Sequence, residues 1–74
     1  MEIVELYSNT SGDSSVYAYD IGSDFITVYF TSGNEYTYTY KSAGTSNVEQ
    51  MKNLARAGSG LNSFINKNCK NDYE

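Results

Sequence analysis

Two stretches dense in β-branched and aromatic residues constrain the fold more than any other part of this 74-residue chain. They run over Phe25–Thr31 and Glu35–Tyr40, and the segment Ser32-Gly33-Asn34 separates them. Such residues favour strands, and a short glycine-containing segment between two such runs is typical of a hairpin turn. The sequence therefore predicts a β-hairpin over residues 25–40.

The pairing of this hairpin follows from burial. Ile26, Val28 and Phe30 share one face because successive strand side chains point in opposite directions. A two-residue turn would place threonines beside them, whereas a three-residue loop, Ser32-Gly33-Asn34, places tyrosines there. The expected pairs are Phe30–Tyr36, Val28–Tyr38 and Ile26–Tyr40. This register buries aromatic rings against aliphatic side chains. In this register, the side chains expected to face outward are those of Thr27, Tyr29, Thr37 and Thr39.

Further elements are predicted on both sides of the hairpin. Ile3–Tyr7 and Ser15–Asp20 are expected to be strands, although the alternation in Ser15–Asp20 leaves open whether Val16 and Ala18 or the tyrosines face inward. A turn follows at Ile21-Gly22-Ser23-Asp24, where Asp20 and Asp24 are expected to supply turn hydrogen bonds.

Helical periodicity replaces strand alternation after residue 44. Ser46 and Glu49 have capping-box spacing, and Gly58 suits the left-handed residue that ends a helix. The apolar residues of this first helix are Val48, Met51, Leu54 and Ala55. A second helix over Leu61–Asn68 is expected to be capped by Ser59 or Asn62, and its buried stripe comprises Leu61, Phe64, Ile65 and Cys69. The predicted class is α+β: one domain over residues 1–74, in the order (β)βββαα, with an antiparallel sheet of three or four strands and two helices on one face.

The composition argues against an enzyme. The chain has no histidine and a single cysteine, Cys69, so the commonest general base is missing and a structural zinc site cannot form. We therefore expect no metal, no cofactor and no catalytic residue. No apolar run approaches a membrane span, and the N-terminus carries acids where a signal peptide carries bases, so a cytoplasmic protein without membrane contact is expected.

Charge divides the chain into two halves. Residues 1–40 carry six acids and no Lys or Arg, whereas residues 41–74 carry five cations against three acids. A polyanionic partner would be repelled by the first half and tolerated by the second. Contact with phosphate, if the chain makes any, is therefore expected in the C-terminal half.

The junction between the two predicted helices is the best candidate for holding an anion. Backbone N–H groups at a helix start lack helical partners, and small residues let a ligand approach closely. The residues expected there are Gly58, Ser59, Gly60, Leu61 and Asn62, with charge added by Arg56, Lys67 and Lys70. The alternative is a tight corner that serves the fold alone. Separate candidates for stacking on bases are Tyr17, Tyr19 and Tyr29.

Most of residues 14–73 resembles the KTSC domain. The residues that carry the resemblance are Ser15-Val16-Tyr17-Ala18-Tyr19-Asp20, Val28 and Phe30 before Ser32-Gly33, Tyr36-Thr37-Tyr38, Ala57-Gly58-Ser59-Gly60, Phe64-Ile65-Asn66 and Tyr73. The chain departs from that pattern at Lys41-Ser42-Ala43-Gly44, where the family often has Val-Pro. KTSC domains occur alone in small bacterial and phage-type proteins and at the C-terminus of some lysyl-tRNA synthetases. The resemblance implies RNA binding, by association with the synthetase.

Two functions follow as hypotheses. The first is a non-enzymatic module that binds nucleic acid or a nucleotide at the helix corner. The second is a protein-interaction or inhibitor module, encoded by a phage or mobile element, that blocks a host factor or sequesters a signalling nucleotide. Its expected surface is the acidic half of the chain, with Asp13, Asp20, Asp24, Glu35, Tyr17 and Tyr29. A homodimer through an edge strand is also expected, because no proline guards the sheet edges.

Overall fold

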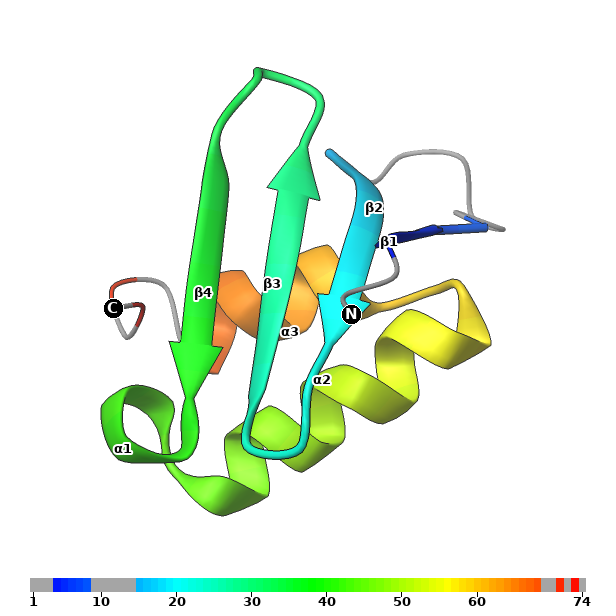
Figure 1. The fold of residues 1–74 in the computed structure, drawn as a ribbon. Helices are drawn as coiled ribbons and strands as arrows, with labels where there is room; N and C mark the ends of the chain where they lie inside the picture. The colour runs from blue at the N-terminus through cyan, green and yellow to red at the C-terminus, as the bar shows by residue number, and fades with distance from the viewer. Residues whose placement is uncertain (1–3, 9–14, 69–70, 72, 74) are drawn as a thin grey trace.

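In the part of the chain that the computed structural model describes, residues 4–8, 15–68, 71 and 73, four strands form one antiparallel sheet and helices follow it (Figure 1). The strands lie in chain order: β1 (Val4–Leu6), β2 (Val16–Ile21), β3 (Phe25–Phe30) and β4 (Glu35–Thr39). The helices are α1 (Tyr40–Ala43), α2 (Thr45–Ala57) and α3 (Leu61–Asn68). The predicted α+β class and element order are confirmed, and α1 is an additional short helix.

The described helices cover one face of the sheet, and no helix of the described residues lies on the other, which is called the uncovered face below. Figure 1 shows α2 and α3 behind the sheet, with no helix in front of it. Side chains from both layers are sealed between them, with at most 1% of their surface exposed: Val16, Ile26, Val28, Tyr38, Val48, Met51 and Leu61. An antiparallel sheet needs only one buried face, and in the described part of the chain the helices cover that face.

The hairpin has the predicted faces but a different register. Val28 pairs with Tyr36 and Ile26 with Tyr38, so the expected pairs are wrong by two residues. The loop is Thr31-Ser32-Gly33, closed by a 2.9 Å hydrogen bond from Phe30 N to Asn34 O. Gly33 has a φ of 97°. The third position of such a loop requires a positive φ, which glycine adopts without strain, and this requirement places Gly33 last rather than in the middle.

The shift of register removes Tyr40 from the sheet. Tyr40 begins α1 instead of lying opposite Ile26, so only two of the three tyrosines expected to face inward, Tyr36 and Tyr38, lie in β4. A capping box forms at α1: Ser42 N donates to Thr39 Oγ1 and Thr39 N donates to Ser42 Oγ, both at 3.0 Å. The capping box expected at Ser46 and Glu49 is wrong, because α2 begins at Thr45 and follows Gly44 without a side-chain cap.

A bulge in β2 settles which of its residues face inward. Val16 pairs with Phe30 and Ala18 with Tyr29, so Tyr17 is an extra residue in this strand. The bulge changes the alternation, and Val16 and Tyr19 therefore both reach the helix-covered side. Tyr17 remains 48% exposed. On the uncovered face, Thr27 is nevertheless buried, and its Oγ1 lies 2.9 Å from Thr37 Oγ1 in a hydrogen bond.

Candidate functional site

The corner between α2 and α3 has the predicted helix stop and start. Gly58 ends α2 in the left-handed conformation, with φ 78°. Its N–H donates to Leu54 O at 3.0 Å and to Ala55 O at 3.2 Å. Gly60, with φ 84°, directly precedes α3. Two glycines thus supply the backbone geometry that the chain needs in order to turn from one helix into the next.

The corner is packed against the segment that follows β1. Leu61 N donates a 3.2 Å hydrogen bond to the hydroxyl of Tyr7, and both residues are buried. A Cβ atom on Gly58 would lie 2.6 Å from Cβ of Ser8, so a larger residue would not fit there. The amide of Leu61, which was expected to hold an anion, is therefore already used within the chain. Tyr7, rather than Ser59 or Asn62, provides its acceptor.

The basic residues expected around the corner do not gather there. Lys67 lies in the last turn of α3, about 9 Å along the helix axis from Leu61 at a rise of about 1.5 Å per residue. In Figure 1, α3 runs behind the sheet from the corner toward β4, so its C-terminal end lies away from the corner. Arg56 is exposed in the last turn of α2. Lys70 lies outside the described residues, as does Cys69.

Tyr19 is not available for stacking. Only 7% of its surface is exposed, on the helix-covered face opposite Val28. Burial raises the pKa of its hydroxyl, the Glu5 charge raises that pKa further, and the Arg56 charge partly offsets both. Arg56 therefore acts electrostatically on the β1–β2 side of the sheet. The prediction of Tyr19 as a stacking residue is wrong, because the bulge at Tyr17 turned it inward.

Tyr17 and Tyr29 form an aromatic pair at the uncovered face. Their ring centroids lie 6.4 Å apart with the planes tilted by 51°. Tyr17 is exposed and Tyr29 is half-buried, and Tyr29 lies opposite the exposed Glu35 in the β3–β4 register. The described part of residues 4–39 carries acids and no Lys or Arg. Aromatic rings and negative charge thus share the sheet half of the domain.

Asp20 belongs to this acidic half but not to the turn. It lies in β2 with 2% of its surface exposed, and its Oδ2 has no hydrogen-bond partner among the described residues. The expectation that Asp20 supplies a turn hydrogen bond is therefore wrong for this oxygen. Asp24 is exposed at the turn, and Asp13 lies outside the described residues.

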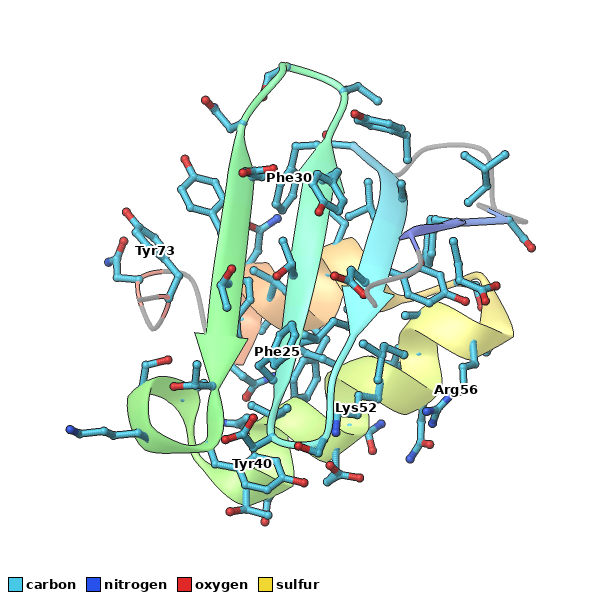
Figure 2. All side chains as sticks on the ribbon, viewed as in Figure 1. Phe25, Phe30, Tyr40, Lys52, Arg56 and Tyr73 are labelled. Carbon is cyan, nitrogen blue, oxygen red and sulfur yellow. The ribbon has the colours of Figure 1, made fainter. Side chains whose placement is uncertain are left out.

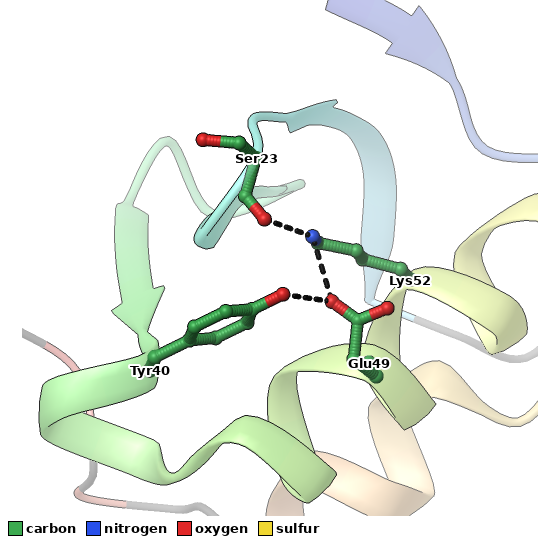
Figure 3. A network of polar contacts seen from close by, with 4 residues as sticks. All are labelled: Ser23, Tyr40, Glu49 and Lys52. Atoms are coloured by element: carbon green, nitrogen blue, oxygen red, sulfur yellow. Dashed lines mark hydrogen bonds and ion pairs between the residues drawn. The ribbon is translucent and has the colours of Figure 1, made fainter.

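Lys52 is committed to a polar network that ties three elements together (Figure 3). Its Nζ donates to Ser23 O at 3.0 Å and to Glu49 Oε2 at 2.9 Å. The Tyr40 hydroxyl donates to the same Glu49 oxygen at 2.5 Å, and Nζ lies 5.4 Å from the Tyr40 ring centroid. Figure 2 places Tyr40 and Lys52 together at the helical end of the domain. The network clamps α1 and α2 to the β2–β3 turn.

This network shifts two pKa values. The hydrogen bond from Tyr40, followed by that from Lys52, holds the pKa of Glu49 below its usual range. The same bond to Glu49, with a smaller contribution from burial, raises the pKa of Tyr40. Both shifts arise because the neutral Tyr40 hydroxyl donates its hydrogen bond to the ionised Glu49 carboxylate, which stabilises both of these protonation states.

Other kinds of site are not found in the described ranges. Residues 4–8, 15–68, 71 and 73 contain no group of three or more acidic, Cys or His side chains placed to hold a metal ion. No helix among them has both the length and the apolar character needed to cross a bilayer. Among the described strands, β4 pairs with β3 alone and so forms one sheet edge. Self-pairing at that edge stays a prediction.

No family model, no curated protein and no solved structure matches this chain. The resemblance to the KTSC domain stays a prediction, and so does the RNA binding that it implies.

Tyr7→Phe tests the packed corner. Removing the hydroxyl leaves the buried Leu61 N–H without an acceptor, and we expect the free energy of unfolding to fall by about 1–3 kcal/mol. Urea unfolding measures this change. Tyr17→Phe is the matched control, because its ring is exposed, and we expect a change within about 0.5 kcal/mol. Equal effects of the two substitutions would show that the Tyr7 hydroxyl does not hold the corner.

Glu49→Gln tests the polar network through pH. Because folding lowers the pKa of Glu49, the carboxylate stabilises the fold fully above its unfolded-state pKa, and this contribution is lost as pH falls through the folded-state pKa. The difference in melting temperature between wild type and Glu49→Gln should therefore be largest at neutral pH and shrink in acid. Tyr40→Phe should remove part of the same acid dependence. A difference that stays constant with pH contradicts the assignment.

Proposed function

We propose that this chain is a non-enzymatic protein-binding module whose uncovered sheet face docks on a basic surface of another protein. The observation that carries the proposal is the Tyr17–Tyr29 pair beside Glu35, on a part of the chain without Lys or Arg. Tyrosines supply large contact area at low entropic cost and are enriched at binding hot spots. Negative charge around them favours a positively charged partner.

The distribution of cations supports the same proposal. The described cations lie on the helices, and Lys52 among them is 5% exposed and engaged with Glu49 and Ser23. A basic partner that approaches the sheet face therefore meets the exposed Glu35 on a strand, whereas the described cations lie on the helices. Charge arranged in this way accelerates association and suppresses docking in the reverse orientation. A module of this kind acts by occupying the basic surface of its partner, as an adaptor or an inhibitor does.

The nucleic-acid hypothesis has less support from the geometry. Nucleic-acid affinity rises with the number of phosphates neutralised, and this chain has five cations in a net charge of −4. At the corner, Leu61 N already has an acceptor and Lys67 lies at the other end of α3. Binding of a nucleotide there would rest on the remaining amides of the first helical turn, beginning with Asn62.

Capture from a cell extract, followed by mapping, tests the proposal. The double variant Tyr17→Ala, Glu35→Gln should lower affinity for the captured protein by about 2 kcal/mol or more, because a hot-spot tyrosine and a rim charge are lost. Lys67→Gln, which removes one exposed charge on the helical side, should leave affinity unchanged. Amide shifts on adding the purified partner should fall on β2, β3 and β4.

A second titration separates the two functions. Mononucleotides and short RNAs are added to the labelled chain in place of the protein. Shifts confined to Ser59, Gly60 and Asn62, together with a captured protein that binds the double variant as tightly as wild type, would contradict the proposal and favour the nucleotide function.

A further inference from the structure

Asp20 faces outward on the uncovered side of the sheet, yet it is buried. Tyr19 pairs with Val28, which is fully buried in the core, and Asp20 pairs with Thr27. Because neighbouring strand residues point to opposite faces, Asp20 and Thr27 share the uncovered face. Asp20 is the only acid in the described ranges with as little as 2% of its surface exposed. An acidic side chain is thus buried on the face of the sheet that no described helix covers.

One oxygen of this carboxylate lacks the partner that a buried charge requires. Asp20 Oδ2 is inaccessible to solvent and has no hydrogen bond among the described residues. An ionised group in such a place is stabilised only by an opposite charge or by donors. The described cations lie on the helices rather than on the strands beside Asp20. The fold itself therefore leaves one strong acceptor without a donor.

Hydroxyl groups continue the same row across the sheet. Thr27 lies beside Asp20 on β3, and Thr37 lies beside Thr27 on β4. Their Oγ1 atoms share one hydrogen bond of 2.9 Å. Since each hydroxyl oxygen has two lone pairs and this bond uses only one of the four, the pair retains acceptor capacity. The row Asp20–Thr27–Thr37 thus presents a carboxylate followed by further oxygen acceptors.

Aromatic rings flank this row on both sides. Phe25 and Tyr29 lie two residues before and after Thr27 on β3, and so on the same face. The Phe25 ring rests on Gly22: a Cβ atom there would lie 1.9 Å from Phe25 Cε1. Gly22 lies two residues beyond Asp20, just past the end of β2, so the Phe25 ring packs on the chain close in sequence to Asp20. Figure 2 shows Phe25 near the turn end of β3. The Phe25 side chain is half-buried.

We propose, building on the proposed function, that a lysine side chain of the basic partner enters between Phe25 and Tyr29 and donates to Asp20 Oδ2. The Phe25 ring swings off Gly22 to admit it, since that oxygen is sealed in the unbound chain. The lysine methylenes then pack on the two rings, which also attract the cation through their faces. The ammonium is compact and has three donors, which suits a row of separate acceptors. A guanidinium prefers both oxygens of one carboxylate edge.

The proposal predicts that a substitution of Asp20 has opposite effects on the stability of the unbound chain and on its affinity for lysine. Asp20→Asn keeps the shape of the side chain and removes the buried charge. Without a ligand, this variant should therefore unfold at a higher urea concentration than wild type. It should bind the lysine less tightly, because the negative charge that pairs with the ammonium is lost. Asp24→Asn is the matched control: it makes the same change in net charge at an exposed position of the adjacent turn.

Titration of the three proteins with hexalysine, followed by amide shifts, tests the proposal. Wild type should bind with shifts at Phe25, Thr27 and Tyr29. Asp20→Asn should weaken binding by at least about tenfold, as the loss of one member of a buried charge pair does. Asp24→Asn should weaken it by about twofold or less, because an exposed charge contributes little.

The other outcomes each overturn a defined part of the account. Equal weakening by Asp20→Asn and Asp24→Asn, with shifts still on the sheet face, overturns the role of Asp20 and leaves the proposed function standing. Absence of any shift on β2, β3 and β4 in wild type contradicts both. Tighter, Asp20-dependent binding of hexaarginine overturns the choice of lysine. A lower urea midpoint for Asp20→Asn than for wild type overturns the inference that the buried charge is unpartnered.

Discussion

Burial of one face of β3 against the helices is the constraint on which the rest of this structure depends. Ile26 and Val28 are fully buried, and every neighbouring element is oriented by them: β4 through Tyr36 and Tyr38, β2 through Tyr19, and α2 through Val48 and Met51. Since side chains alternate along a strand, fixing this face also fixes what faces outward. The aromatic and acidic surface is thus a direct consequence of how the core is packed.

Local patterns predicted most of the fold, because the forces behind them are local. The strand alternation of Phe25–Phe30, the apolar spacing in Thr45–Ala57 and the left-handed Gly58 each follow from neighbouring residues alone. The hairpin register was predicted with the right faces but two residues off. Parity constrains the faces, whereas the register depends on which loop position requires a positive φ, and Gly33 occupies the last one.

The features that could not be predicted are those set by distant residues or by single irregularities. The acceptor for Leu61 N comes from Tyr7, 54 residues away, and no spacing rule reports such a contact. The bulge at Tyr17 reverses which β2 side chains face inward after that residue, and no glycine in β2 marks its position in the sequence. The short helix α1 rests on one Thr39–Ser42 capping box, a pair that is common in turns as well. For the candidate site, the outward face of Tyr29 follows from alternation, whereas alternation left the face of Tyr17 open and could not predict the burial of Asp20.

The division of charge has a structural counterpart. Lys52 closes a network with Glu49, Tyr40 and Ser23, so one of the described cations serves the fold rather than a ligand. The acids of the sheet half have no such role among the described contacts: Glu35 is exposed, and Asp20 is buried without a donor on Oδ2. The charged network with described contacts thus stabilises the helical side, and the proposed function assigns recognition to the sheet side.

One measurement tests this one-sided arrangement most directly: the paramagnetic relaxation that a soluble, uncharged gadolinium chelate induces in the tyrosine ring protons. If helices cover only the face of β3 that carries Ile26 and Val28, the Tyr17 ring relaxes strongly and the rings of Tyr19 and Tyr38 are protected, in line with their exposed fractions of 48%, 7% and 1%. Relaxation of Tyr38 as strong as that of Tyr17 would mean that the helices do not cover this face, and the account would be wrong.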